Sequence, residues 1–300
     1  MRYLALAGAV ALIAAALPAS AQQGMAALRA AQAKVPPPTL VERYGPDDLR
    51  SGELRLPPGK GPFPVAVVIH GGCWQAKVDT VQGITPLAEA LRKRGVATWA
   101  IEYRRLGNPG GGWPGTFEDV AAGTDHLARL ARRHPLDMKR VALVGHSAGA
   151  HLALWAASRP KLDARFRGRG AIRPTTVVAI DGPGALAPFV GIDAQVCGEP
   201  VIVPLMGGTP AEKPDAYRAA SPAEHLPLGL RQLLVVGEFG PFMAPYAQAA
   251  KAAGDPVEVL SPAGANHFDI VTPGTVNGDA VANFVTQRVS GAVGKTDQPR

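Results

Sequence analysis

Short apolar runs alternate along this chain with longer segments in which apolar residues recur at helical spacing. The runs predict buried strands at residues 65–69, 96–101, 140–144, 176–180, 232–236 and 257–260. The longer segments predict helices at 80–94 and 117–133, a third ending near 158, and two more at 242–253 and 279–289. Buried strands that alternate with helices are typical of a mainly parallel sheet with helices on both faces, so the pattern predicts an α/β fold.

One long connection interrupts this alternation. Residues 181–230 are rich in proline and glycine and contain none of the predicted strands or helices. The segment is too long for an ordinary connection in a compact domain, and it is too apolar to be a disordered linker. We therefore expect it to fold over the edge of the sheet as a cap or substrate wall.

The first residues follow the pattern of a secretory signal peptide. Arg2 precedes an apolar run from Leu4 to Leu17, and small residues follow at 19–21. The run is shorter than the roughly 20 apolar residues that span a membrane. We predict a signal peptide at 1–21, a flexible arm at 22–45, the folded domain at 46–292, and export to the periplasm or the medium without a membrane anchor.

Charge and cysteine content bear on whether the protein binds nucleic acid or a metal ion. The formal net charge is +7, but the basic residues are scattered along the chain, so we do not expect nucleic-acid binding. Cys73 and Cys197 lack the close spacing of metal ligands. In an oxidising compartment they either form a disulfide or remain buried thiols, and the sequence leaves both possibilities open.

A nucleophile motif lies between a predicted strand and a predicted helix. Residues 145–149 read Gly-His-Ser-Ala-Gly, which is the GxSxG pattern of a strained turn that exposes a serine hydroxyl at a helix N-terminus. The helix dipole there favours developing negative charge. The motif predicts Ser147 as the nucleophile of an acyl-transfer reaction.

Two further segments supply the groups that such a serine requires. The strand at 65–69 ends in His-Gly-Gly, so the backbone N–H groups of Gly72 and Cys73, with that of Ala148, are candidates for an oxyanion hole. His267 follows the last predicted strand. In sites of this type the histidine comes after both the nucleophile and the catalytic carboxylate in the sequence. We predict His267 as the general base.

These motifs resemble the α/β-hydrolase superfamily, in the esterase branch that contains arylformamidases (kynurenine formamidases) and related carboxylesterases. The resemblance is carried by "HGGCW", "GHSAGAHLALWAA" and "NHFDIV" and covers about residues 50 to 290. It implies an α/β-hydrolase fold and the roles given above for Ser147, His267 and the oxyanion-hole residues Gly72, Cys73 and Ala148. It also implies a structural role for Asp119 within a "YR…P…D" segment. The acyl-enzyme chemistry itself needs no metal or organic cofactor.

The catalytic carboxylate departs from the family pattern. Family members typically read Gly-x-x-Asp-Pro after the seventh strand, whereas this chain has Gly240 where the aspartate is expected. Asp181, at the end of the preceding strand, is one candidate, because strand ends on that edge face the active site. Glu238, two residues before the gap, is another, and a Ser–His pair without a carboxylate is the third possibility.

The motifs together predict an exported serine hydrolase that cleaves a small carboxylic ester or amide through an acyl-enzyme. One alternative is an exported peptidase of the prolyl-oligopeptidase type, although 300 residues leave no room for the propeller domain of many such enzymes. The other alternative is a non-catalytic binding protein on a hydrolase fold, which the missing aspartate makes conceivable.

Overall fold

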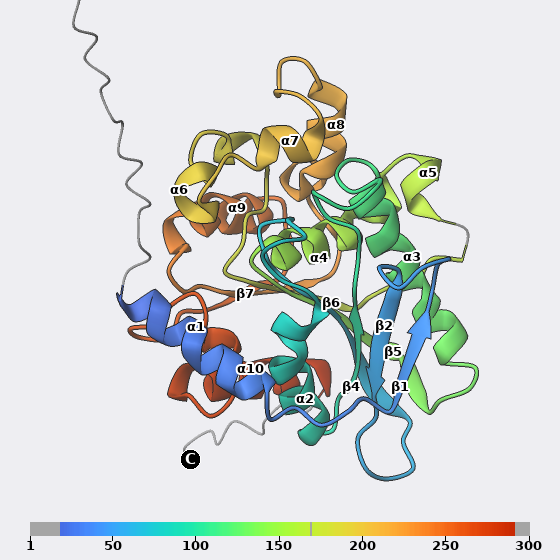
Figure 1. Ribbon diagram of the computed structural model, residues 1–300. Helices are drawn as coiled ribbons and strands as arrows, with labels where there is room; N and C mark the ends of the chain where they lie inside the picture. Colours follow the sequence, from blue (N-terminus) through green and yellow to red (C-terminus); the bar gives the residue numbers. More distant parts are fainter. Residues whose placement is uncertain (1–18, 169, 292–300) are drawn as a thin grey trace, which may run out of the picture.

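The computed structural model describes residues 19–168 and 170–291, in which strands and helices alternate (Figure 1). The strands are β1 Leu40–Arg43, β2 Ser51–Arg55, β3 Phe63–Ile69, β4 Ala97–Ile101, β5 Leu136–His146, β6 Thr176–Ile180, β7 Arg231–Val235 and β8 Val257–Leu260. The α-helices are α1 Ala19–Gln32, α2 Thr85–Lys93, α3 Gly115–Leu130, α4 Ala148–Ser158, α5 Ala164–Arg167, α6 Asp193–Cys197, α7 Ile202–Met206, α8 Pro214–Ala220, α9 Gly240–Ala252 and α10 Val276–Val289.

All of these strands belong to one sheet with the order β1-β2-β4-β3-β5-β6-β7-β8. The pairs β1–β2 and β2–β4 are antiparallel, and every other neighbouring pair is parallel. This confirms the predicted α/β fold with a mainly parallel sheet. Because β3, β5, β6 and β7 run in the same direction, the segments that follow them emerge at one edge, where ligands bind in sheets of this kind.

The two faces of the sheet pack into separate hydrophobic cores, as the alternation of side chains along a strand requires. In β3, Val65 and Val67 contribute to the core beneath α3, α4 and α9, whereas Ala66 and Val68 contribute to the core beneath α1, α2 and α10. All four side chains are fully buried. Helices therefore cover both faces, as predicted.

The N-terminal segment differs from its prediction as a flexible arm. It contains strand β1 and most of helix α1, which begins at Ala19, and Leu28 of α1 is buried in the core beneath α2 and α10. Gly24 packs so closely on the loop before α10 that a Cβ there would lie 2.3 Å from the Asn266 side chain. An Ala-rich segment forms a helix readily. The pattern of apolar residues did not indicate that this helix packs against the domain. The predicted signal peptide lies largely outside the described residues.

Residues 181–230 form a compact layer beyond the sheet edge. They contain α6, α7 and α8, which lie together above α4 and α9 in Figure 1. Helix α7 is held by its buried Ile202, Leu205 and Met206, and the Leu205 carbonyl accepts a hydrogen bond from the Trp113 N–H at 2.6 Å. The segment thus has its own apolar contacts with the domain. Among residues 19–168 and 170–291, no helix is long and apolar enough to cross a bilayer.

Candidate active site

Ser147 occupies the sharp turn between β5 and α4. Its backbone has φ 57° and ψ −124°, a conformation that costs energy in a residue with a Cβ. Gly145 and Gly149 make the turn possible, because a Cβ on Gly145 would lie 1.9 Å from the Gly149 carbonyl oxygen. The Ser147 N–H donates to the carbonyl of Ile180 at 2.8 Å, which ties the turn to the end of β6.

Backbone strain is concentrated around this serine. The non-glycine residues with positive φ in the described part of the chain are Cys73, Trp74, Ser147 and Asp181. All four line one pocket. Unfavourable backbone conformations persist where the surrounding structure enforces them, and they cluster at functional sites. The distribution of strain therefore marks this pocket independently of any motif.

The loop after β3 lies on one side of the pocket. Gly72 has φ 97°, and the turn that it begins brings Cys73 and Trp74 to the pocket wall beside Ser147 and Ala148. Within residues 19–168 and 170–291, neither the Cys73 N–H nor the Ala148 N–H has an acceptor in the protein. The two donors are therefore available to a substrate oxygen, as an oxyanion hole requires.

Buried polar contacts hold this loop in place. His70 Nε2 lies 2.9 Å from Glu102 Oε1, and His70 Nδ1 lies 2.8 Å from the carbonyl oxygen of Gly71. The Tyr103 hydroxyl donates to the His70 carbonyl at 2.8 Å, and its ring stacks on the imidazole. His70 is thus a structural residue. Asp119 is also structural, since it binds the Arg104 guanidinium through both carboxylate oxygens at 2.7 Å.

Asp181 and His267 form the central pair of the site. His267 Nδ1 lies 2.8 Å from Asp181 Oδ2, and the Asp181 side chain is fully buried. Asp181 Oδ1 accepts hydrogen bonds from the N–H groups of Gly237 and Phe239, each at 2.9 Å. Burial by itself raises the pKa of Asp181, but the hydrogen bond and charge of His267, together with the two backbone donors, bring it below its ordinary value.

Glu238 does not contact His267. Its side chain is exposed, and among the described residues no hydrogen bond or ion pair joins it to another group. The loop after β7 instead contributes its backbone: Gly237 and Phe239 donate to Asp181, and a Cβ on Gly237 would come within 3.1 Å of Asp181 Oδ2. Gly240, at the expected aspartate position, is the first residue of α9. Of the two candidate carboxylates, the structure brings only Asp181 to the histidine.

His146, which lies between the first glycine and the serine of the motif, contacts both the backbone and the ring of His267. His146 Nε2 donates to the carbonyl oxygen of His267 at 2.8 Å, and the two ring centroids are 4.4 Å apart. Burial, followed by the nearby charge of His267, lowers the pKa of His146 to about 3, so its ring stays neutral. The Phe239 ring also packs on the His267 ring, with the two ring centroids 4.4 Å apart. Sequence reasoning assigned no role to His146 or Phe239.

Ser147 and His267 are not joined by a direct hydrogen bond in this structure. Ser147 lines the pocket together with Asp181 and Phe239, both of which contact the imidazole. In ligand-free sites such hydrogen bonds are often long and shorten when substrate binds. Asp269 braces the loop that carries His267 by accepting from the Asn266 N–H at 2.9 Å and from the Asn277 amide at 2.8 Å.

The pocket in front of Ser147 is small and largely apolar. It encloses about 20 Å³ and is lined by Cys73, Trp74, Ser147, Ala148, Asp181, Pro183, Phe189, Asp193, Val196, Cys197 and Phe239. A water molecule needs about 10–15 Å³ of such space. The cavity therefore has room for about one small group, and the 181–230 segment supplies much of its wall.

The two cysteines form a disulfide across this pocket, which resolves the alternative that the sequence left open. Cys73 lies in the loop after β3 and Cys197 at the end of α6, with Cα atoms 5.9 Å apart, a usual separation for bonded cysteines. No cluster of metal-binding side chains occurs among the described residues.

Comparison with known proteins relates the chain to esterases and a formamidase. It is 31% identical to a kynurenine formamidase of Meyerozyma guilliermondii over 112 residues, which is 37% of this chain and 40% of that protein. It is 28% identical to the probable carboxylic ester hydrolase LipM of Mycobacterium tuberculosis over 198 residues, 63% of this chain and 44% of that protein. The alignments thus span less than half of either relative.

Solved structures show the same fold. Esterase B from Lactobacillus rhamnosis superimposes with a TM-score of 0.72 at 17% identity, covering 91% of this chain and 92% of that one. An esterase from Pyrobaculum calidifontis gives 0.69 at 20% identity, covering 92% and 93%. These similarities confirm the α/β-hydrolase fold. Residues 53–241 match the model of the BD-FAE family, a span that contains the turn at Ser147, the loop after β3 and Asp181. The chain belongs to the BD-FAE family.

Proposed function

We propose that this protein is a serine hydrolase that cleaves a small carboxylic ester or amide through an acyl-enzyme. The observation that carries the proposal is the Asp181–His267 hydrogen bond of 2.8 Å at the pocket that Ser147 lines. A strained serine, an imidazole, a buried carboxylate and free backbone N–H donors are the groups that acyl transfer requires. No metal or organic cofactor is needed for this chemistry.

The geometry assigns a task to each group. With its Nδ1 proton directed at Asp181, His267 has its lone pair on Nε2, where it takes the hydroxyl proton as Ser147 Oγ attacks the carbonyl carbon. The Asp181 carboxylate, kept ionised by its hydrogen bonds, stabilises the imidazolium that results. The N–H groups of Gly72, Cys73 and Ala148 receive the oxyanion.

The second half of the reaction uses the same groups. The imidazolium of His267 returns its proton to the departing alcohol or amine as the tetrahedral intermediate collapses to an ester on Ser147. Water, deprotonated by His267, then attacks this ester, and collapse of the second intermediate releases the acid and restores the serine hydroxyl. The names of the relatives, a formamidase and a carboxylic ester hydrolase, support an amide or ester substrate.

The pocket supports a small acyl group. About 20 Å³ of apolar-walled space beside Ser147 fits a hydrogen or a methyl group on the carbonyl carbon better than a longer chain. We also propose that the protein is exported, since its first 21 residues have the pattern of a signal peptide and its cysteines form a disulfide. Disulfides of this kind persist in oxidising compartments.

Labelling and turnover test the proposal together. A fluorophosphonate probe is expected to label the native protein and not Ser147→Ala, and hydrolysis of p-nitrophenyl acetate is expected to fall by at least about 10³-fold in that variant. Ser158→Ala, at the other end of α4, is the matched control and keeps both properties. Equal labelling of native protein and Ser147→Ala would refute the serine mechanism.

A further inference from the structure

Helix α6 contributes three of the residues with which the 181–230 segment lines the pocket, beside Asp181, Pro183 and Phe189. Asp193, Val196 and Cys197 of this five-residue helix line the pocket together with Ser147. The pocket has little free space because this wall is close, so the position of α6 decides how long an acyl group fits beside the serine. What holds α6 therefore also determines which substrates the site accepts.

The hydrogen bonds of α6 keep its own segment together and do not attach it to the sheet. Asp193, its one buried residue, accepts from the N–H groups of Gly191, Val201 and Ile202 at 3.0, 2.7 and 2.8 Å. Val201 and Ile202 are themselves buried at the start of α7, so these bonds tie one end of α6 to α7. The helix thus has no apolar residue buried in the core, in contrast with α7, which buries three.

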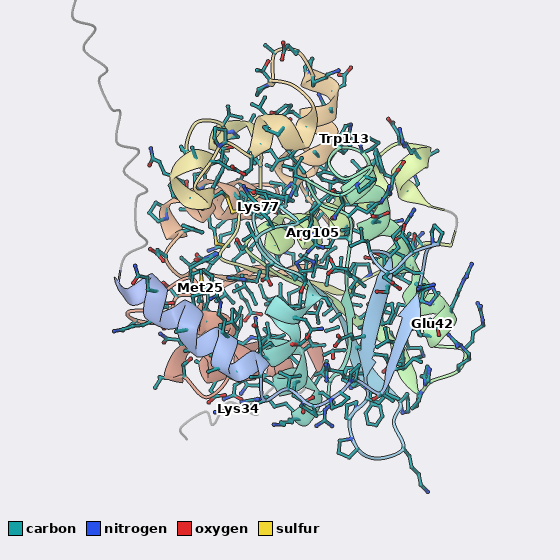
Figure 2. The ribbon with its side chains drawn as sticks, in the orientation of Figure 1. Met25, Lys34, Glu42, Lys77, Arg105 and Trp113 are labelled. Carbon is teal, nitrogen blue, oxygen red and sulfur yellow. A yellow bond between two sulfur atoms is a disulfide. The ribbon has the colours of Figure 1, made fainter. Side chains whose placement is uncertain are left out.

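Two links cross from α6 and the turn after it to the loop that follows β3. One is the Cys73–Cys197 disulfide. The other is an ion pair of 2.7 Å between Lys77 and Glu199, whose side chains are 67% and 47% exposed. Lys77 is labelled in Figure 2. Exposed ion pairs contribute about 0–1 kcal/mol. Of these two links to the loop after β3, the covalent bond is therefore the one that limits the distance between α6 and Ser147.

We propose that the Cys73–Cys197 disulfide limits the acyl-chain length that the site accepts, by holding α6 against the pocket. The proposal rests on the serine hydrolase function proposed above. It makes Cys197 a specificity-determining residue that never reacts with substrate. When the bond is absent, α6 is held on this side only by the hydrogen bonds of Asp193 and the exposed ion pair, and outward movement of the helix lengthens the pocket.

The test compares acyl chains within each protein, because the ratio is insensitive to a general loss of activity. We expect the kcat/KM ratio of p-nitrophenyl octanoate to p-nitrophenyl acetate to rise at least tenfold in Cys197→Ser and Cys73→Ser. Native protein treated with dithiothreitol provides a second measurement without substitution: the disulfide takes up two electrons and two protons to give two thiols, and the dithiol is oxidised to its cyclic disulfide. The same rise is expected there.

Lys77→Ala is the matched control, since it removes the ion pair across the same gap and leaves the disulfide intact. Its ratio is expected to stay within twofold of the native value. An unchanged ratio in Cys197→Ser and in the reduced protein would overturn the proposal, as would an equal rise in Lys77→Ala. Failure of the native protein to hydrolyse either ester would refute the hydrolase function instead, so the two failures are distinguishable.

Discussion

Replacing Asp181 by asparagine changes the chemistry of the central pair and very little else. The carboxylate accepts three hydrogen bonds, one from His267 and two from the backbone of Gly237 and Phe239. In Asp181→Asn the amide oxygen still serves the two backbone donors, so the fold is retained. The amide nitrogen then faces His267 Nδ1 and donates to it, which moves the imidazole proton to Nε2. An imidazole with its proton on Nε2 cannot accept the serine proton.

The size of the effect follows from this change of tautomer. Where a triad aspartate is replaced by asparagine without loss of geometry, turnover falls by about 10⁴-fold. At 1.36 kcal/mol for each factor of ten, this corresponds to about 5.4 kcal/mol of lost transition-state stabilisation. The loss belongs mainly in kcat, because Asp181 acts on His267 and the substrate makes the same ground-state contacts with the rest of the pocket.

Glu238→Gln is the matched comparison, since Glu238 was the other candidate acid and its side chain is exposed. The kcat for p-nitrophenyl acetate is expected to stay within threefold of native in this variant and to fall by about 10⁴-fold in Asp181→Asn. Thermal unfolding of both variants checks that each is folded. A decrease below tenfold in Asp181→Asn, or an equal decrease in Glu238→Gln, would show that our assignment of the acid is wrong.

Two further predictions concern acid stability and export. Burial lowers the pKa of His146 to about 3 and that of His151 to about 4, while both residues titrate near 6.5 when unfolded. The unfolded chain therefore binds more protons between pH 4 and 6.5, and the free energy of unfolding should decrease as pH falls, with a slope approaching about 2.7 kcal/mol per pH unit; urea unfolding across this range checks the slope, and a flat profile contradicts it. If the protein is exported as proposed, mass spectrometry of the secreted form will find Gln22 at its N-terminus, whereas intact protein starting at Met1 in the cytoplasm would contradict export.

The parts of the site that depend on local backbone chemistry could be predicted from the sequence. A glycine–serine turn between a strand and a helix, and a glycine pair after a strand, impose their geometry through short-range sterics. Ser147 and the loop at Gly72 and Cys73 therefore lie where the pattern places them. His267 could be located from the order of the elements, because each parallel strand ends at the same edge of the sheet.

The carboxylate could not be chosen in this way, because its identity depends on how two loops meet in space. The strands before Asp181 and Glu238 both end at the site, and their spacing is equally compatible with either role. What selects Asp181 is the backbone after β7, which directs the N–H groups of Gly237 and Phe239 at its carboxylate. Such a contact between distant segments leaves no periodic pattern in the sequence.

The disulfide and the packing of the N-terminal helix could not be predicted from the sequence for the same reason. Cys73 and Cys197 are separated by 124 residues, and their approach depends on how the 181–230 segment folds. Helix α1 is recognisable as helix-forming, but its stability depends on the burial of Leu28 against α2 and α10. Strands β1 and β2 are too short and too polar to stand out from the loops around them.

His267 lies C-terminal to the segment that matches the family, so the proposed site depends on residues outside that segment. The segment that matches the family ends at residue 241, so it contains Ser147 and Asp181 but not the histidine. The loop that carries His267 rests in turn on α1, where Gly24 packs against Asn266. A fragment limited to the matching segment would therefore contain Ser147 and Asp181 without His267, so grafting the proposed site onto another scaffold requires the regions on both sides of that segment.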